Sequence, residues 1–139
     1  VLANDEIMNV IKPGQHGSTF GGNPIACAVA IAVLDVVADE NLSERAEELG
    51  KLFRSEIEQL IEKTDLINGV RGKGLLNAIL INDTPESKTA WNLCVKLKEN
   101  GLLAKPTHGN IIRLAPPLVI TEEQLLECVK IIEKTVLAF

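Results

Sequence analysis

Aromatic residues and positive charge are both scarce in this sequence. Only 3% of the 139 residues are aromatic and none is tyrosine, which disfavours the stacking surfaces on which proteins bind single-stranded nucleic acid. The 14 basic residues are outnumbered by 19 acidic ones, giving a net charge of −5. The two signs are interleaved along the chain. The composition therefore argues against a nucleic-acid partner and against an anionic membrane partner.

Cysteine is also rare, and no apolar run is long enough to cross a membrane. Cys27, Cys94 and Cys128 are widely separated and lie in apolar periodic stretches, a pattern that predicts buried free thiols in a reducing compartment. The Cys and His residues show no metal-ligand spacing. The longest apolar stretch, residues 25–37, is interrupted by Asp35 and is too short for a bilayer span. We therefore expect a soluble cytoplasmic protein, or a mitochondrial matrix protein if the source is a eukaryote.

The most informative segment is a glycine-rich loop at residues 16–24, His-Gly-Ser-Thr-Phe-Gly-Gly-Asn-Pro. Its glycines let a ligand approach the backbone, and Ser18 and Thr19 offer hydroxyl groups. Asn23 followed by Pro24 predicts a helix N-cap with proline at the first helical position. The start of such a helix favours an anion such as phosphate. A plain connection that only caps a helix explains the same residues equally well on chemistry alone, and the loop matches neither a Walker nor a GxGxxG motif.

Residues 1–40 are expected to form two helices that belong to a larger body. The apolar positions of residues 5–11 predict a short helix closed by the turn at Pro13 and Gly14. Residues 24–39 are small and apolar on nearly every side, which predicts a helix buried among neighbours. The chain also begins abruptly at Val1, as if at the end of a strand. We therefore expect a piece of a longer protein.

After residue 40 the hydrophobic pattern predicts a two-layer α+β domain, in the order helix, strand, strand, helix, strand, strand, helix. Asn41 and Thr121 are expected to cap the first and last of these helices. Between them, strands are expected at residues 66–71, 75–81, 102–104 and 111–114, and a helix at residues 86–100.

Four segments in this order resemble one known family. They are residues 16–24, the bend Val-Arg-Gly-Lys-Gly-Leu at 70–75, the run Gly-Leu-Leu-Ala-Lys-Pro-Thr-His-Gly at 101–109, and Ile-Arg-Leu-Ala-Pro-Pro at 112–117. Their order and spacing resemble the carboxy-terminal third of class III, fold-type I pyridoxal-phosphate aminotransferases, and residues 101–109 resemble the ornithine branch of that family. The resemblance implies an α/β fold, with residues 1–40 ending the large cofactor-binding domain and residues 41–139 forming a small α+β domain whose helices pack on a mainly antiparallel sheet.

The resemblance also implies roles for individual residues. Thr19, with Ser18 and Gly17 beside it, matches the position that binds the phosphate of pyridoxal 5′-phosphate in the neighbouring subunit of a homodimer. The alternative is that Thr19 is only a turn residue. Arg113 matches the arginine that binds a substrate carboxylate, and its alternative is a strand arginine that points to solvent.

Several other polar residues are weaker candidates. Arg71 and Lys73 fit solvated charges better than anion ligands. His16 suits loop packing or capping at least as well as a contact to the cofactor. His108 is a candidate for the border of the substrate entrance.

The reaction implied by the resemblance is transfer of the δ-amino group of L-ornithine to 2-oxoglutarate, giving glutamate 5-semialdehyde and glutamate. That chemistry needs a lysine that binds the cofactor covalently. No lysine here has the sequence context that the family uses, so we expect no catalytic residue in this chain and no activity from it alone. Two alternatives stay open: a non-catalytic α+β binding or assembly module, and a sister aminotransferase acting on acetylornithine or 4-aminobutyrate.

Overall fold

The computed structural model describes residues 2–139 and divides into two compact units, Val1–Ala38 and Asp39–Phe139. The first three residues were expected to end a strand, but Leu2 and Ala3 are not in a strand, and Val1 lies outside the described residues. No helix within residues 2–139 is both long and apolar enough to cross a bilayer. The two units are described separately below.

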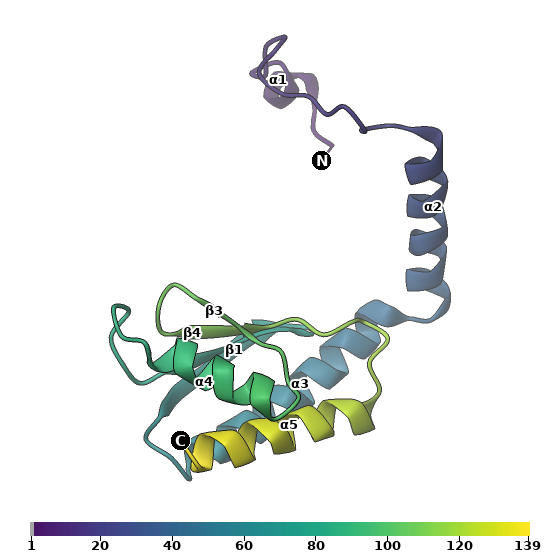
Figure 1. The fold of residues 1–139 in the computed structure, drawn as a ribbon. Helices are drawn as coiled ribbons and strands as arrows, with labels where there is room; N and C mark the ends of the chain where they lie inside the picture. Colours follow the sequence, from purple (N-terminus) through teal and green to yellow (C-terminus); the bar gives the residue numbers. More distant parts are fainter. Residues whose placement is uncertain (1) are drawn as a thin grey trace. The chain divides into compact units, whose positions relative to one another are not determined.

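The first unit contains helix α1 (Asp5–Met8) and most of helix α2 (Pro24–Asp39) (Figure 1). Asn4 is the N-cap of helix α1, and its side-chain oxygen accepts a hydrogen bond from the Ile7 amide at 3.2 Å. It ends three residues earlier than expected. The amide of Asn9 still reaches back to Asp5 O, at 2.9 Å. Beyond it, Lys12 N donates to Gln15 Oε1 at 2.7 Å, so the chain turns instead of continuing the helix.

Helix α2 forms where the sequence predicted it, but none of its residues is buried. Ile25 and Leu34 expose 78% and 68% of their surface. Cys27 is likewise exposed, contrary to the expected buried thiol. The apolar pattern was interpreted as burial among neighbours, and among the described residues no neighbour covers this helix. Its alanine-rich sequence nevertheless suits a helix, because alanine has the highest helix propensity.

The second unit is a four-stranded sheet with three helices. The helices are α3 (Leu42–Ile61), α4 (Thr89–Glu99) and α5 (Glu122–Leu137). The strands are β1 (Ile67–Lys73), β2 (Leu76–Ile81), β3 (Lys105–Thr107) and β4 (Ile111–Leu114), in the order β1-β2-β4-β3 with every pair antiparallel. The predicted order of elements and the antiparallel sheet are confirmed.

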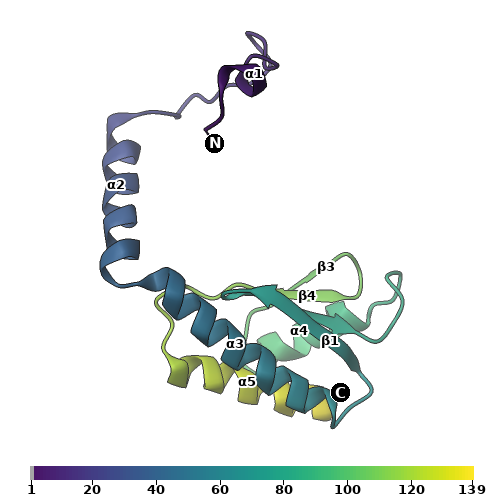
Figure 2. The same cartoon turned by 180° about the vertical axis from the view of Figure 1, so that it is seen from behind.

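All three helices pack on one face of the sheet (Figures 1 and 2). Helix α3 contacts β1 and β2, α4 contacts β3 and β4, and α5 packs against α3 and α4. Side chains alternate along the strands, so that Ile79 and Ile112 face the helices and are almost fully buried. Ile57 of α3 has no exposed surface, and burial of such a side chain stabilises the fold by about 1.5–3 kcal/mol.

Two local expectations need correction. The third strand was expected at residues 102–104, but β3 starts at Lys105. Leu102 and Ala104 pack against the core without pairing to β4, whereas the next three residues form the ladder. Asn41 precedes α3, but its φ of 50° lies in the left-handed region and its side chain makes no capping hydrogen bond. Thr121, in contrast, forms the complete capping box with Gln124, as predicted.

Both edges of the sheet are irregular or short. In β1, the pairing with β2 shifts register between Ile67 and Gly69. Strand β3 has three residues, and Pro106 is the central one. Proline is tolerated there because an edge strand leaves some of its amides without a partner.

The turn between β1 and β2 packs closely against α3 and is hydrogen-bonded to it. Gly74 has a left-handed φ of +54°, and a Cβ at Gly50 of α3 would overlap the Gly74 carbonyl oxygen. Arg54 of α3 donates to Asn77 Oδ1 at 2.9 Å, and Asn77 Nδ2 donates to Gly74 O at 3.1 Å. Asn77 is buried, so these bonds satisfy polar atoms that would otherwise destabilise the core.

We predict that Gly50→Ala destabilises the chain even though alanine favours a helix. The new methyl group forces α3 and the turn apart, and overpacking of this kind costs about 1–3 kcal/mol. Ser55→Ala, at an exposed position of the same helix, is the matched control and should change stability by less than about 0.5 kcal/mol. Urea unfolding of both variants measures the difference. Equal midpoints for the two variants would show that the helix and the turn are not in tight contact.

Candidate functional site

The glycine-rich loop is organised by short-range hydrogen bonds. Ser18 Oγ accepts from the Gly21 amide at 3.0 Å. Asn23 Nδ2 donates to Phe20 O at 2.7 Å, and Asn23 Oδ1 accepts from the Ala26 amide at 2.9 Å. The predicted N-cap at Asn23, with Pro24 as the first residue of α2, is therefore confirmed. The loop consequently leads directly into the amino-terminal turn of a 16-residue helix.

Thr19 has unused hydrogen-bonding capacity. It is exposed, and among residues 2–139 neither its hydroxyl nor its amide has a hydrogen-bond partner. Gly17 is open as well, because a Cβ there would meet no atom within 4 Å. Residues 16–24 contain no carboxylate. The donors present thus fit a phosphate group, which hydroxyl and amide donors at a helix start bind well.

The other residues of the loop have structural roles or no visible one. Gly22 has a φ of +71°, which glycine adopts readily. The Ser18 side chain is engaged with Gly21, although its hydroxyl hydrogen is still available to a ligand. His16 is exposed, and within the described chain its side chain caps nothing.

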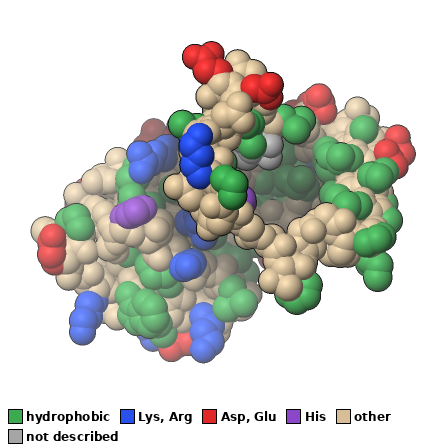
Figure 3. Space-filling view, turned by 90° about the horizontal axis from the view of Figure 1, so that it is seen from above, with side chains coloured by type: hydrophobic (Ala, Val, Ile, Leu, Met, Phe, Trp, Pro, Cys, Tyr) green, Lys and Arg blue, Asp and Glu red, His purple; other side chains and the backbone are tan. Residues whose placement is uncertain are grey.

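Arg113 lies on the face of the sheet that no helix of this unit covers. In the ladder its Cα partners are Ala78 of β2 and Lys105 of β3, and Ala78 in turn pairs with Arg71 of β1. Directly paired residues of antiparallel strands share a face. The register therefore aligns three cationic residues and one small residue in a row across the sheet. Several Lys and Arg side chains are exposed in the space-filling view from above (Figure 3).

A groove of about 340 Å³ follows this face. It brings together Arg71, Arg113 and His108, three residues that the sequence suggested separately. Arg113 and Arg71 are exposed and form no ion pair with any described residue. The residues around them are Gly72, Lys73, Leu76, Asn77, Ala78, Thr107 and Ile111. The arrangement can bind a carboxylate, because a guanidinium offers two parallel donors to it.

Lys73 differs from the two arginines because it already has a partner. Its Nζ lies 2.9 Å from Glu47 Oε2. This hydrogen bond and charge hold the pKa of Glu47 below its ordinary value. The Gly74 amide donates to the same carboxylate at 3.3 Å. Lys73 therefore stays exposed to solvent and forms a surface ion pair with Glu47 of α3.

His108 is held in a strained backbone conformation beside the groove. Its φ of 49° is left-handed, which is uncommon for a residue with a side chain. The turn that contains it is fixed on its far side: Asn110 Nδ2 donates to Asp83 O at 3.0 Å, and a Cβ at Gly109 would overlap Pro85 O. The sequence did not predict this conformation.

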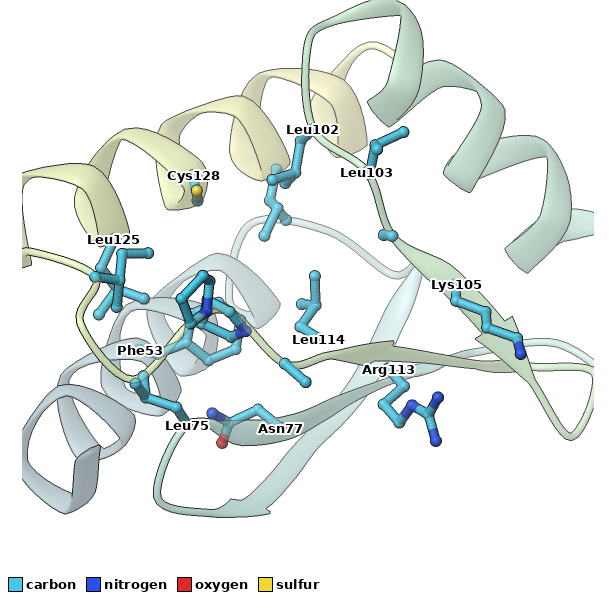
Figure 4. Close-up of a pocket in the computed structure, with 16 residues that line it drawn as sticks. Phe53, Leu75, Asn77, Leu102, Leu103, Lys105, Arg113, Leu114, Leu125 and Cys128 are labelled. Carbon is cyan, nitrogen blue, oxygen red and sulfur yellow. The ribbon is translucent and has the colours of Figure 1, made fainter. Parts of the chain in front are cut away.

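A larger cavity of about 550 Å³ opens between α5, the approach to β3 and the segment after β4 (Figure 4). It is mainly apolar, and Arg113 and Lys105 lie at its border. Cys128 lines it, and burial raises the pKa of that thiol. Burial also raises the pKa of Cys94, to about 11. Both thiols are thus protonated at neutral pH and are weak nucleophiles.

The model of the family described as "Aminotransferase class-III" matches residues 1–136. The chain belongs to the class-III aminotransferase family. Mitochondrial ornithine aminotransferase of Rattus norvegicus is 55% identical over 139 residues, which is 100% of this chain and 31% of the relative. The chain therefore spans about a third of the length of such relatives.

Solved structures of class-III aminotransferases share the fold. An acetylornithine aminotransferase from Elizabethkingia anophelis is 86% identical with a TM-score of 0.88, over 99% of this chain and 34% of that chain. A Plasmodium falciparum ornithine δ-aminotransferase is 46% identical with a TM-score of 0.84, over 99% of this chain and 35% of that chain. These matches confirm the expected fold-type I architecture.

The ion pair between Lys73 and Glu47 predicts a specific pH response. Because the pKa of Glu47 is lower in the folded chain than in the unfolded chain, the pair stabilises the fold at neutral pH, and this contribution is lost as the pH falls through the folded-state pKa. Lys73→Met should return the Glu47 pKa toward its ordinary value in a carboxyl NMR titration. An unchanged Glu47 titration in the variant would rule out this pairing in solution.

Proposed function

We propose that this chain is the carboxy-terminal part of an ornithine aminotransferase that transfers the δ-amino group of L-ornithine to 2-oxoglutarate. One observation carries the proposal: the match to ornithine aminotransferases runs through the whole chain, including both the phosphate-type loop and the strand of Arg113. Such an uninterrupted match disfavours an independent non-catalytic module. The activity belongs to a longer protein, since the chain covers 31% of the rat enzyme.

Pyridoxal 5′-phosphate, when bound, supplies the carbonyl and electron-accepting chemistry of this family. In our proposal Thr19 binds its phosphate, with Ser18 and Gly17 beside it, in the site of the partner subunit of a homodimer. The unpaired hydroxyl and amide of Thr19 support this role. The lysine that carries the cofactor is expected outside this chain, which on its own should neither retain the cofactor nor turn over substrate.

Arg113 binds the carboxylate of the amino-group acceptor. The position of Arg113 in the groove supports this role. Its guanidinium is exposed, has no ion-pair partner among residues 2–139, and lies on the uncovered face of the sheet. A fixed strand position limits where the carboxylate can be held, so it orients the substrate as well as attracting it. We further propose a reducing compartment, the cytoplasm or the mitochondrial matrix if the source is a eukaryote, which the free cysteines support.

A second candidate function is favoured by one comparison. The solved structure that is 86% identical to this chain is described as an acetylornithine aminotransferase. N-acetylornithine and ornithine differ in the α-nitrogen, which is an amide in one and a charged amine in the other. Steady-state assays of the intact enzyme with each donor decide between them: a higher kcat/KM for ornithine supports our proposal, and a higher value for N-acetylornithine replaces it.

Thr19→Ala in the intact enzyme should weaken cofactor retention. The lost contact to a phosphate is worth about 1–3 kcal/mol, which equals roughly 5- to 150-fold in the dissociation constant. Titration of the apoenzyme with pyridoxal 5′-phosphate measures this constant. Thr19→Ser keeps a hydroxyl and is the control. Equal affinity for all three proteins would leave Thr19 as a turn residue.

Arg113→Lys in the intact enzyme should raise the KM for 2-oxoglutarate, because a single ammonium cannot reproduce the two parallel hydrogen bonds of a guanidinium. The cofactor absorbance should stay normal. Arg71→Lys, in the same row of the sheet, is the matched control and should change KM little. Normal kinetics of Arg113→Lys with the carboxylate substrates would refute the assigned role.

A further inference from the structure

Lys105 lies directly opposite Arg113 in the β3–β4 ladder. Cβ atoms of such antiparallel partners are about 4.5–5.5 Å apart. Both side chains are exposed, and both point to the same side, away from the apolar cavity that they border (Figure 4). A single small anion between them can therefore contact both.

The charges of this pair are not balanced within the described chain. Like charges directly opposite one another on antiparallel strands repel. Neither Lys105 nor Arg113 has a carboxylate within ion-pair distance among residues 2–139. Lys73, at the other edge of the same sheet, shows the usual solution, because Glu47 neutralises it. A bound carboxylate would remove the repulsion between Lys105 and Arg113 in the same way.

The backbone that carries Lys105 is well held. Strand β3 pairs with β4 at all three of its residues. The turn after it is fixed to residues 83–85 by Asn110 and by the close approach of Gly109 to Pro85. Lys105 is consequently presented from a fixed strand and not from a loose loop, which favours a defined binding geometry.

We propose that Lys105 is a second carboxylate-binding residue, which acts together with Arg113 on one carboxylate of the 2-oxo acid acceptor. The inference rests on the proposed function and deepens it by naming a second residue for the same anion. Arg113 supplies the fork that orients the carboxylate. Lys105 adds a mobile ammonium that increases the attraction.

The test uses the intact aminotransferase that contains this chain. Lys105→Met should raise the KM for 2-oxoglutarate by about 2- to 5-fold, as expected for the loss of one exposed ion pair, with kcat nearly unchanged. It should also weaken binding of glutarate, a dicarboxylate without a reacting carbonyl, as measured by calorimetry. Lys105→Arg keeps the positive charge. Its KM for 2-oxoglutarate and its affinity for glutarate should therefore stay close to those of the unmodified enzyme.

Lys73→Met is the matched control. It removes a positive charge from the same face of the sheet, but that charge is already neutralised by Glu47. An equal rise in KM for Lys73→Met and Lys105→Met would overturn the inference in favour of a general field effect. Normal KM and glutarate binding in Lys105→Met, with Arg113→Lys impaired, would overturn it while leaving the proposed function intact. If KM and glutarate binding are normal in both Arg113→Lys and Lys105→Met, the proposed carboxylate site itself is refuted. If Lys105→Met does not fold, Lys105→Gln replaces it with the same expected outcomes.

Discussion

One-sided coverage of the antiparallel sheet is the constraint on which the rest of the second unit depends. Three helices cover one face and leave the other open, so successive residues of each strand meet opposite environments. Ile112 is buried among the helices, and its neighbour Arg113 is consequently exposed on the open face. The same alternation puts Ile79 in the core and Ala78 beside the groove. The pairing register of the strands therefore determines both which residues form the core and where the candidate site lies.

The sequence predicted this unit well where the hydrophobic pattern was long and regular. The order of helices and strands, the cap at Thr121 and the strand of Arg113 could all be predicted, because each depends on local chemistry. The start of β3 could not be predicted. Leu102 and Ala104 are apolar because they pack against the core, and they do not belong to the strand. The left-handed φ of His108 was not predicted either, because histidine has no strong local preference for that region.

Helix α2 shows a different limit of sequence interpretation. Its position and its cap could be predicted from Asn23 and Pro24, whereas its burial could not be judged from one chain segment. The pairing of Lys105 with Arg113 was not predicted either, because the strand was expected at residues 102–104 and lies at Lys105–Thr107. The family match and the ornithine-type donor could both be predicted from short segments, because these segments have the same order and spacing as in the ornithine aminotransferases.

The edges of the sheet limit how this unit can associate with other proteins. A free strand edge normally invites a further strand from a neighbouring molecule. Here β3 is too short and has Pro106 at its centre, and the irregular pairing of β1 near Gly69 interrupts the opposite edge. Neither edge is a good template for β-augmentation. The two edges therefore favour association through side-chain surfaces, which select partners by shape and charge instead of by the generic hydrogen-bonding pattern of the backbone.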